Sequence, residues 1–102
     1  MALYQWISCL EHEKLVPRLF ESIQETGLEI DPEYSSEHFI YARERDGHHC
    51  TWNSRVNILV SQTTGDQDEY LIEVRSSEPM LKKATRCEQV AAKVKTLIPP
   101  RN

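Results

Sequence analysis

The stretch of residues 55–76, RVNILVSQTTGDQDEYLIEVRS, predicts a β-hairpin and decides the fold class. Apolar and polar side chains alternate on both sides of a glycine- and aspartate-containing segment, 63–68, of the kind that forms turns. A period of two is that of a strand with one buried face. The hairpin therefore predicts a sheet packed on a core, and its buried residues are Val56, Ile58, Val60, Tyr70, Ile72 and Val74.

The register of this hairpin follows from placing buried positions opposite buried positions, because a slip of one residue would turn charged side chains into the core. The other face of the hairpin carries mostly polar residues, with Leu59 and Leu71 as apolar exceptions. The predicted pairs are Val60 with Tyr70, Ile58 with Ile72, and Val56 with Val74.

A second hairpin is expected upstream, centred on Asp46-Gly47, because this dipeptide favours a two-residue type I′ turn. The run before it, HFIYARER, is extended. This turn pairs Tyr41 with Trp52 if the following strand has no bulge. Phe39 and Tyr41 would then join the buried face, and Ile40 would lie on the opposite face with Leu59 and Leu71.

Two amphipathic helices flank these strands. In residues 13–25 apolar side chains recur every three or four positions, and Gly27 is suited to end the helix. The helix is expected to begin near residues 11–13, since proline inside a helix costs about 3 kcal/mol and Pro17 must stay close to the first turn. Its apolar stripe is Leu15, Val16, Leu19, Phe20 and Ile23.

The second helix is predicted to start at a capping box, Thr85 with Glu88, and to stop before Pro99-Pro100. Its apolar stripe is Cys87, Val90, Ala91, Val94, Leu97 and Ile98. Short strands are expected at residues 3–7 and 28–30. The order β-α-β-β-β-(β)-α predicts a single α+β domain over residues 1–102, with a twisted antiparallel sheet of four to five strands and both helices on one face.

Composition excludes several classes of protein. Sixteen acidic and twelve basic residues give a net charge of −4, which disfavours non-specific binding to nucleic acid. No run approaches the roughly 20 apolar residues that cross a bilayer, and the N-terminal residues lack the pattern of a secretory signal. Three widely spaced cysteines do not suggest disulfides. The expectation is a cytoplasmic protein with reduced thiols and no membrane association.

No pattern of residues identifies a reaction or a cofactor. In His48-His49-Cys50 the side chains of His48 and Cys50 could share a metal, but His49 points the other way on a strand and no second ligand pair accompanies them. Cys87 lies near a predicted helix N-terminus, where a thiol can be activated, yet it also belongs to the apolar stripe. We expect neither a metal site nor a catalytic cysteine, and the protein is predicted not to be an enzyme.

A basic and aromatic surface is a third candidate site. Four arginines, with Tyr41 and Trp52, could contact nucleic acid by stacking and by charge. They do not all share a face, and neighbouring glutamates cancel much of their field, so a structural surface is favoured. The arginines are Arg43, Arg45, Arg55 and Arg75.

The leading hypothesis is a small accessory or interaction domain that binds a protein partner, or a second copy of itself, through an exposed sheet face or edge. This hypothesis rests on the apolar residues of the otherwise polar face and on nearby arginines, namely Ile40, Leu59, Leu71, Arg55 and Arg75. The alternative is a small-molecule-binding domain with a cavity between sheet and helices, lined by Trp6, Phe20, Phe39, Tyr41 and Trp52.

The chain resembles an uncharacterised bacterial domain family in which a strand reading Ile-Glu-Val-Arg-Ser-Ser precedes a C-terminal helix. Here residues 72–77 have that sequence and residues 85–97 stand where the helix follows, without the asparagine and arginine pairing of that helix. The resemblance implies an α+β domain and no known reaction. The element order is also similar to helix-grip and TATA-binding-protein-like domains, an analogy of fold alone.

Overall fold

The computed structural model describes residues 1–36, 39–44, 55–63, 69–79 and 84–101. Five strands, two α-helices and one short 3₁₀ turn, η1, account for most of them. In chain order the elements are β1 (Ala2–Cys9), α1 (His12–Thr26), β2 (Leu28–Ile30), η1 (Pro32–Tyr34), β3 (Phe39–Glu44), β4 (Asn57–Gln62), β5 (Glu69–Ser76) and α2 (Arg86–Leu97).

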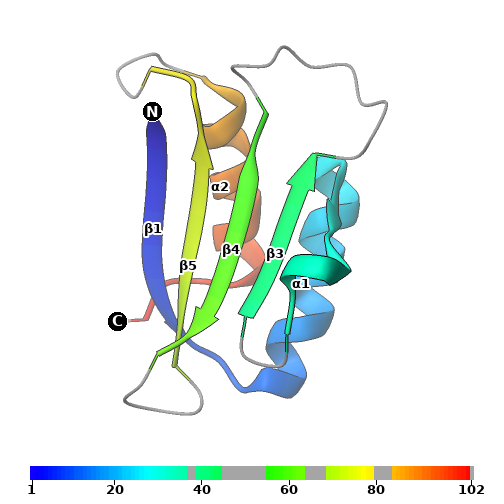
Figure 1. The fold of residues 1–102 in the computed structure, drawn as a ribbon. Helices are drawn as coiled ribbons and strands as arrows, with labels where there is room; N and C mark the ends of the chain where they lie inside the picture. The colour runs from blue at the N-terminus through cyan, green and yellow to red at the C-terminus, as the bar shows by residue number, and fades with distance from the viewer. Residues whose placement is uncertain (37–38, 45–54, 64–68, 80–83, 102) are drawn as a thin grey trace.

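The strands form one antiparallel sheet in the order β1-β5-β4-β3-β2. Both helices lie behind this sheet in Figure 1, with α2 behind the β1–β5 side and α1 behind the β3–β2 side. The α+β class, the element order and the placement of both helices on one face are confirmed. Neither described helix is long and apolar enough to cross a membrane.

A simple rule assigns the two faces of the sheet. The ladders place even-numbered residues opposite even-numbered residues on all five strands, so these positions share the face toward the helices. The core that they form with the helices includes every hairpin residue predicted to be buried. Its members are Ala2, Trp6, Leu15, Leu19, Ile23, Leu28, Ala42, Val56, Ile58, Val60, Tyr70, Ile72, Val74, Cys87, Val90, Ala91, Val94 and Ile98.

The predicted pairing of β4 with β5 was wrong by two residues. Val60 lies opposite Ile72 and Ile58 opposite Val74, while Tyr70 lies opposite Gln62. A shift of two leaves every side chain on its predicted face, since the strand period is two. Hydrophobic alternation therefore determined the buried face of the hairpin but not its pairing.

The predicted face of β3 was also wrong. Ile40 pairs with Val60 and Ala42 pairs with Ile58, so Ile40 faces the helices and packs against the core. Phe39 and Tyr41 consequently point to the other side. The prediction depended on the turn and strand expected within residues 45–54, which lie outside the described residues, and a one-residue difference there reverses the face of a whole strand.

Helix α1 buries a more polar surface than its apolar stripe predicts. Phe20 is 49% exposed, whereas Ser22 is fully buried and Thr26 nearly so. The Ser22 hydroxyl donates to the Arg18 carbonyl (2.9 Å) and the Thr26 hydroxyl donates to the Ser22 carbonyl (2.8 Å). A hydroxyl satisfied within its own helix can be buried at little cost, so the buried face is rotated away from Phe20.

The N-terminus of α2 is capped from two sides. As predicted, Thr85 is the N-cap residue, and its Oγ1 accepts a hydrogen bond from the Glu88 backbone N–H (3.1 Å). The buried carboxylate of Glu78, from the turn after β5, accepts the backbone N–H groups of Arg86 (3.1 Å) and Cys87 (3.0 Å). A carboxylate also suits the positive end of the helix dipole. This second cap connects β5 to α2.

A buried ion pair between Glu44 and Arg86 connects the two helices to the sheet. The Arg86 guanidinium donates to both carboxylate oxygens of Glu44, at 2.6 and 2.9 Å, and to the Thr26 carbonyl at 2.8 Å. Glu44 also accepts the Val56 backbone N–H at 3.1 Å. The Glu44–Arg86 pair thus joins the end of β3, the residue before β4, the C-terminus of α1 and the N-terminus of α2.

Candidate interaction surface

The side of the sheet away from the helices is the candidate site, and we call it the open face. Figure 1 is viewed from this side: α1 and α2 lie behind the sheet, and the short η1 turn packs beside β3, where Tyr34 meets Tyr41. It consists of the odd-numbered residues of four strands, which the ladders place side by side. Apart from Cys9 and Glu69 at the strand ends, they are Leu3, Gln5, Ile7, Phe39, Tyr41, Arg43, Asn57, Leu59, Ser61, Leu71, Glu73 and Arg75.

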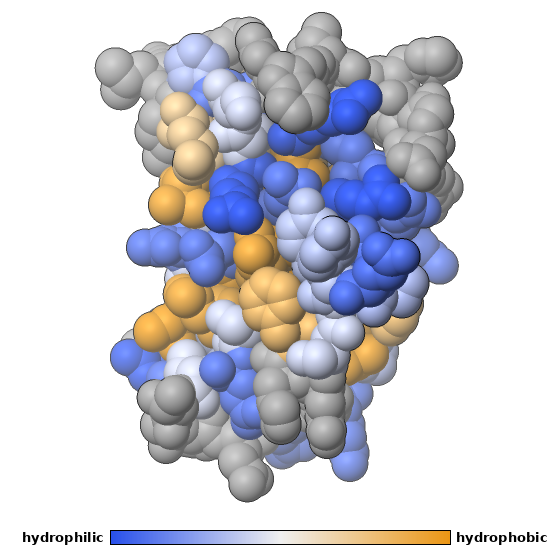
Figure 2. Space-filling view, viewed as in Figure 1, coloured by the Kyte–Doolittle hydropathy of each residue, from blue (hydrophilic) through white to orange (hydrophobic). Residues whose placement is uncertain are grey.

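An apolar belt crosses the open face from β1 to β3. Ile7 lies opposite Leu71, and Ser61 separates Leu71 from Phe39 in the same row. Leu59 lies in the adjoining row, diagonal to Leu71. We define these four apolar residues, Ile7, Leu59, Leu71 and Phe39, as the apolar belt. Figure 2 shows hydrophobic residues gathered across this face between polar ones, and all four are half-buried.

The β3–β2 flank of the belt is a satisfied polar network. The Tyr41 hydroxyl donates to the Asn57 side-chain oxygen (3.0 Å), and its ring meets that of Tyr34 edge to face. Arg43 donates to Asp31 (3.2 Å) and lies 3.6 Å from a carboxylate oxygen of Glu29. Arg43 thus has carboxylate partners within the chain, so its charge does not require a counter-ion from a ligand.

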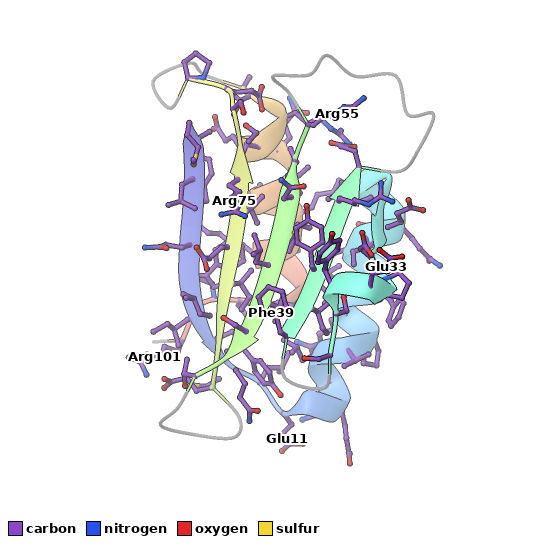
Figure 3. All side chains as sticks on the ribbon, viewed as in Figure 1. Glu11, Glu33, Phe39, Arg55, Arg75 and Arg101 are labelled. Atoms are coloured by element: carbon purple, nitrogen blue, oxygen red, sulfur yellow. The ribbon has the colours of Figure 1, made fainter. Side chains whose placement is uncertain are left out.

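Two charged residues of β5, next to the belt, differ from this flank because they lack partners within the described chain. The side chains of Glu73 and Arg75 form no hydrogen bond or ion pair with any residue that the structure describes. Arg75 lies on the open face (Figure 3), opposite Leu3 on one neighbouring strand and Asn57 on the other. A half-buried guanidinium beside an apolar surface is suited to a bidentate contact with a carboxylate.

The structure brings together part of the predicted partner-binding set. Leu59, Leu71 and Arg75 share the open face, whereas Ile40 lies on the core face. Arg55 is exposed just before β4 (Figure 3). The belt residues missing from the prediction are Ile7 and Phe39. The alternation of residues 3–7 could have found Ile7, but Phe39 depended on the register of β3.

The residues proposed to line a cavity are not brought together. Trp6 faces α2, where its indole N–H donates to the Ile98 carbonyl (3.0 Å) and Lys95 lies over its ring. Phe20 is on the exposed side of α1 and Phe39 and Tyr41 are on the open face. Trp52 lies outside the described residues. The four described side chains thus occupy three separate environments.

The candidate thiol chemistry finds little support at Cys87. This residue is fully buried, and its sulfur lies 3.4 Å from the Val74 carbonyl oxygen. Burial, with a smaller contribution from Glu78, raises the pKa of the thiol from 9.0 to about 11, despite the opposing effect of a hydrogen bond with Ser76. An activated cysteine requires the opposite shift and an accessible sulfur. Cys87 packs as a small core residue.

The raised pKa of Cys87 predicts a loss of stability at high pH. Between pH 9 and about 11 the unfolded chain releases the thiol proton while the folded chain retains it, so unfolding is favoured as pH rises through this range. Urea unfolding at pH 8 and pH 10.5 should show a larger fall in midpoint for the wild type than for Cys87→Ala. Equal falls would contradict the assignment.

The candidate metal ligands in His48-His49-Cys50 lie outside the described part of the chain. Within the described ranges, no three histidine, cysteine or acidic side chains are grouped so that they could hold a metal ion. Comparison with protein-family models, curated proteins and solved structures found no match to this chain. The surface must therefore be interpreted from its own geometry.

Proposed function

We propose that this chain is a small interaction domain without catalytic activity that binds a protein partner through the open face. The observation that carries the proposal is the apolar belt, four half-buried apolar side chains in adjoining rows of a sheet face that neither α1 nor α2 covers. Contiguous exposed apolar patches on small domains are typical of sites that bind other proteins.

The chemistry of the partner follows from the surroundings of the belt. The ordered flank at Arg43 has its own counter-ions, so it requires none from outside. Arg75 and Glu73 have none among the described residues, and they lie at the β5 side of the belt. We infer a partner that presents apolar side chains with a carboxylate placed to meet Arg75 and a basic group placed to meet Glu73.

A charged substitution in the belt tests this proposal. Tagged wild type, Leu59→Glu and Arg75→Glu are used to capture partners from a lysate of the source cells, and the captured protein is identified, purified and titrated calorimetrically. Loss of a contact that is central and desolvated in a complex raises the dissociation constant at least about tenfold. Leu59→Glu should cause such a loss, and Arg75→Glu a smaller one.

Gln24→Glu supplies the matched control, because Gln24 is exposed on α1 in the opposite layer. Gln24→Glu adds the same charge as Leu59→Glu and should bind the partner as the wild type does. Circular dichroism checks that all three variants are folded. Equal binding by Leu59→Glu and the wild type would refute the open face as the binding surface. The cytoplasmic location and the family resemblance of residues 72–77 stay as predictions beside this one.

A further inference from the structure

The outer edge of the sheet at β1 carries a second inference, separate from the apolar belt. β1 is an edge strand of eight residues whose ladder partner is β5 alone (Figure 1). The Ile7 carbonyl accepts the Arg101 backbone N–H at 2.8 Å, so it points away from β5. Backbone groups alternate in direction along an antiparallel strand, and the outward groups therefore belong to Leu3, Gln5, Ile7 and Cys9.

The neighbouring strand, β5, gives the same assignment independently. The Glu69 carbonyl accepts the Thr63 N–H on the β4 side (3.0 Å), so the odd-numbered residues of β5 bond to β4 and the even-numbered ones to β1. Within the described chain, the backbone N–H and carbonyl groups of Leu3 and Gln5 consequently have no partner strand.

Apart from the C-terminal segment, which bonds to it at Ile7, this edge lacks the usual protection against strand addition. Edge strands are commonly kept apart by brevity, charged side chains, proline or bulges. β1 reads ALYQWISC and pairs with β5 without interruption, so it is long, uncharged, free of proline and free of bulges. The opposite edge, β2, has three residues, contains Glu29 and is followed by Asp31 and Pro32. Of the two sheet edges that the structure describes, the β1 edge is thus the one suited to extend the sheet.

We propose that the β1 edge pairs with the β1 edge of a second copy of this chain, forming a continuous antiparallel sheet across a two-fold axis at Gln5. The sequence of the strand is self-complementary in this register. Residues whose numbers add to ten face one another, so the hydrogen-bonded pairs are Leu3 with Ile7 of the second copy and Gln5 with Gln5.

The neighbouring positions fit the same register. On the helix side Tyr4 meets Trp6 of the second copy and Ala2 meets Ser8. Tyr4 and Trp6 form non-hydrogen-bonded pairs, whose side chains are closest, and aromatic pairs at such positions stabilise sheets. No position places a charge opposite a charge. Pairing one edge with its own copy also leaves only the β2 edges outside, which closes the assembly at two chains.

The C-terminal segment opposes this pairing at one point. Arg101 bonds to the Ile7 carbonyl and its guanidinium donates to Glu69 at 2.6 Å. Pairing along the whole edge requires Arg101 to leave the Ile7 carbonyl, which the Leu3 N–H of the second copy would then occupy. The bonds at Gln5 are not affected. The dimer should therefore dissociate on dilution.

Proline at position 5 tests the interface without removing a bond within one chain, because the Gln5 N–H points outward. Light scattering across a range of concentrations should show a wild-type dimer, and Gln5→Pro should raise its dissociation constant about tenfold to a hundredfold through two lost central hydrogen bonds. Gln5→Ala keeps both bonds and should remain dimeric. A wild type that stays monomeric at millimolar concentration, or a dimer unaffected by proline, would overturn the proposal.

A cross-link checks the register and remains informative if the proline variant fails to fold. In a Cys9→Ser, Cys50→Ser background, Gln5→Cys should form a disulfide between copies under mild oxidation, because hydrogen-bonded pairs place their Cα atoms about 5.5 Å apart. Ser61→Cys, at the centre of the open face, should not. Cross-linking at 61 and not at 5 would indicate packing of faces and overturn edge pairing. The light-scattering and cross-linking experiments use the purified chain alone. A negative result would therefore overturn the edge-paired dimer without bearing on the binding of another protein through the open face.

Discussion

An Ile72→Ala variant is expected to unfold with a free energy about 2–5 kcal/mol below that of the wild type. Ile72 is fully buried on the interior strand β5, between Trp6 on β1 and Val60 on β4. Truncation removes apolar surface from the core and leaves a cavity that two flanking strands and α2 prevent from collapsing. Urea unfolding followed by circular dichroism measures the difference, with the slope of the transition unchanged.

The adjacent residue is the matched control. Leu71 is half-buried on the open face, so Leu71→Ala should cost less than about 1 kcal/mol while weakening binding of the partner. Equal losses of stability for the two variants would mean that a structural layer covers both faces of β5. In that case the open face would not be available for binding.

Replacement of Arg86 by Met should destabilise the protein by about 3–5 kcal/mol. Arg86 supplies two of the hydrogen bonds to the Glu44 carboxylate, which is only 6% exposed, and one to the Thr26 carbonyl. Without the guanidinium a buried charge is left uncompensated and the terminus of α1 loses a donor. Thermal or urea unfolding at neutral pH measures this loss.

The double variant Glu44→Leu, Arg86→Met separates the ion pair from simple packing. Removal of both charges should recover part of the stability lost in the single variant, because the remaining carboxylate is the main source of the loss. Its recovery will be incomplete, since Val56 and Thr26 still lose a partner. The double variant could instead be less stable than Arg86→Met by the amount expected for a second, independent core substitution. The unpaired Glu44 carboxylate would then not be the source of the stability lost in Arg86→Met.

The hairpin from β4 to β5 shows how much of the fold the sequence could predict. Alternation identifies which residues are buried whatever the pairing, so Ile58 and Val74 were assigned to the core even though their partners were wrong. The face of β3 could not be predicted in this way. HFIYARER has apolar side chains on both sides, and its face depends on a register that local pattern does not determine.

Contacts between distant residues account for the other differences. The predicted stripe of α1 included Phe20 because large apolar residues are expected inside, but Ser22 is buried with its hydroxyl bonded to its own helix. The Glu44–Arg86 pair joins positions 42 residues apart, and no local pattern predicts it. The sequence predicts only part of the apolar belt, because Phe39 belongs to it through the long-range pairing of β3 with β4.

The most direct test of the open face as the binding surface is a photo-cross-link to the captured partner. A benzophenone amino acid is placed at Leu59, in the apolar belt, or at Phe20, which is 49% exposed on the helix layer. Both sites are partly exposed apolar positions, so the replacement is comparably mild at each. We predict a cross-link to the partner from position 59 and none from position 20. A cross-link from position 20 alone would contradict the account.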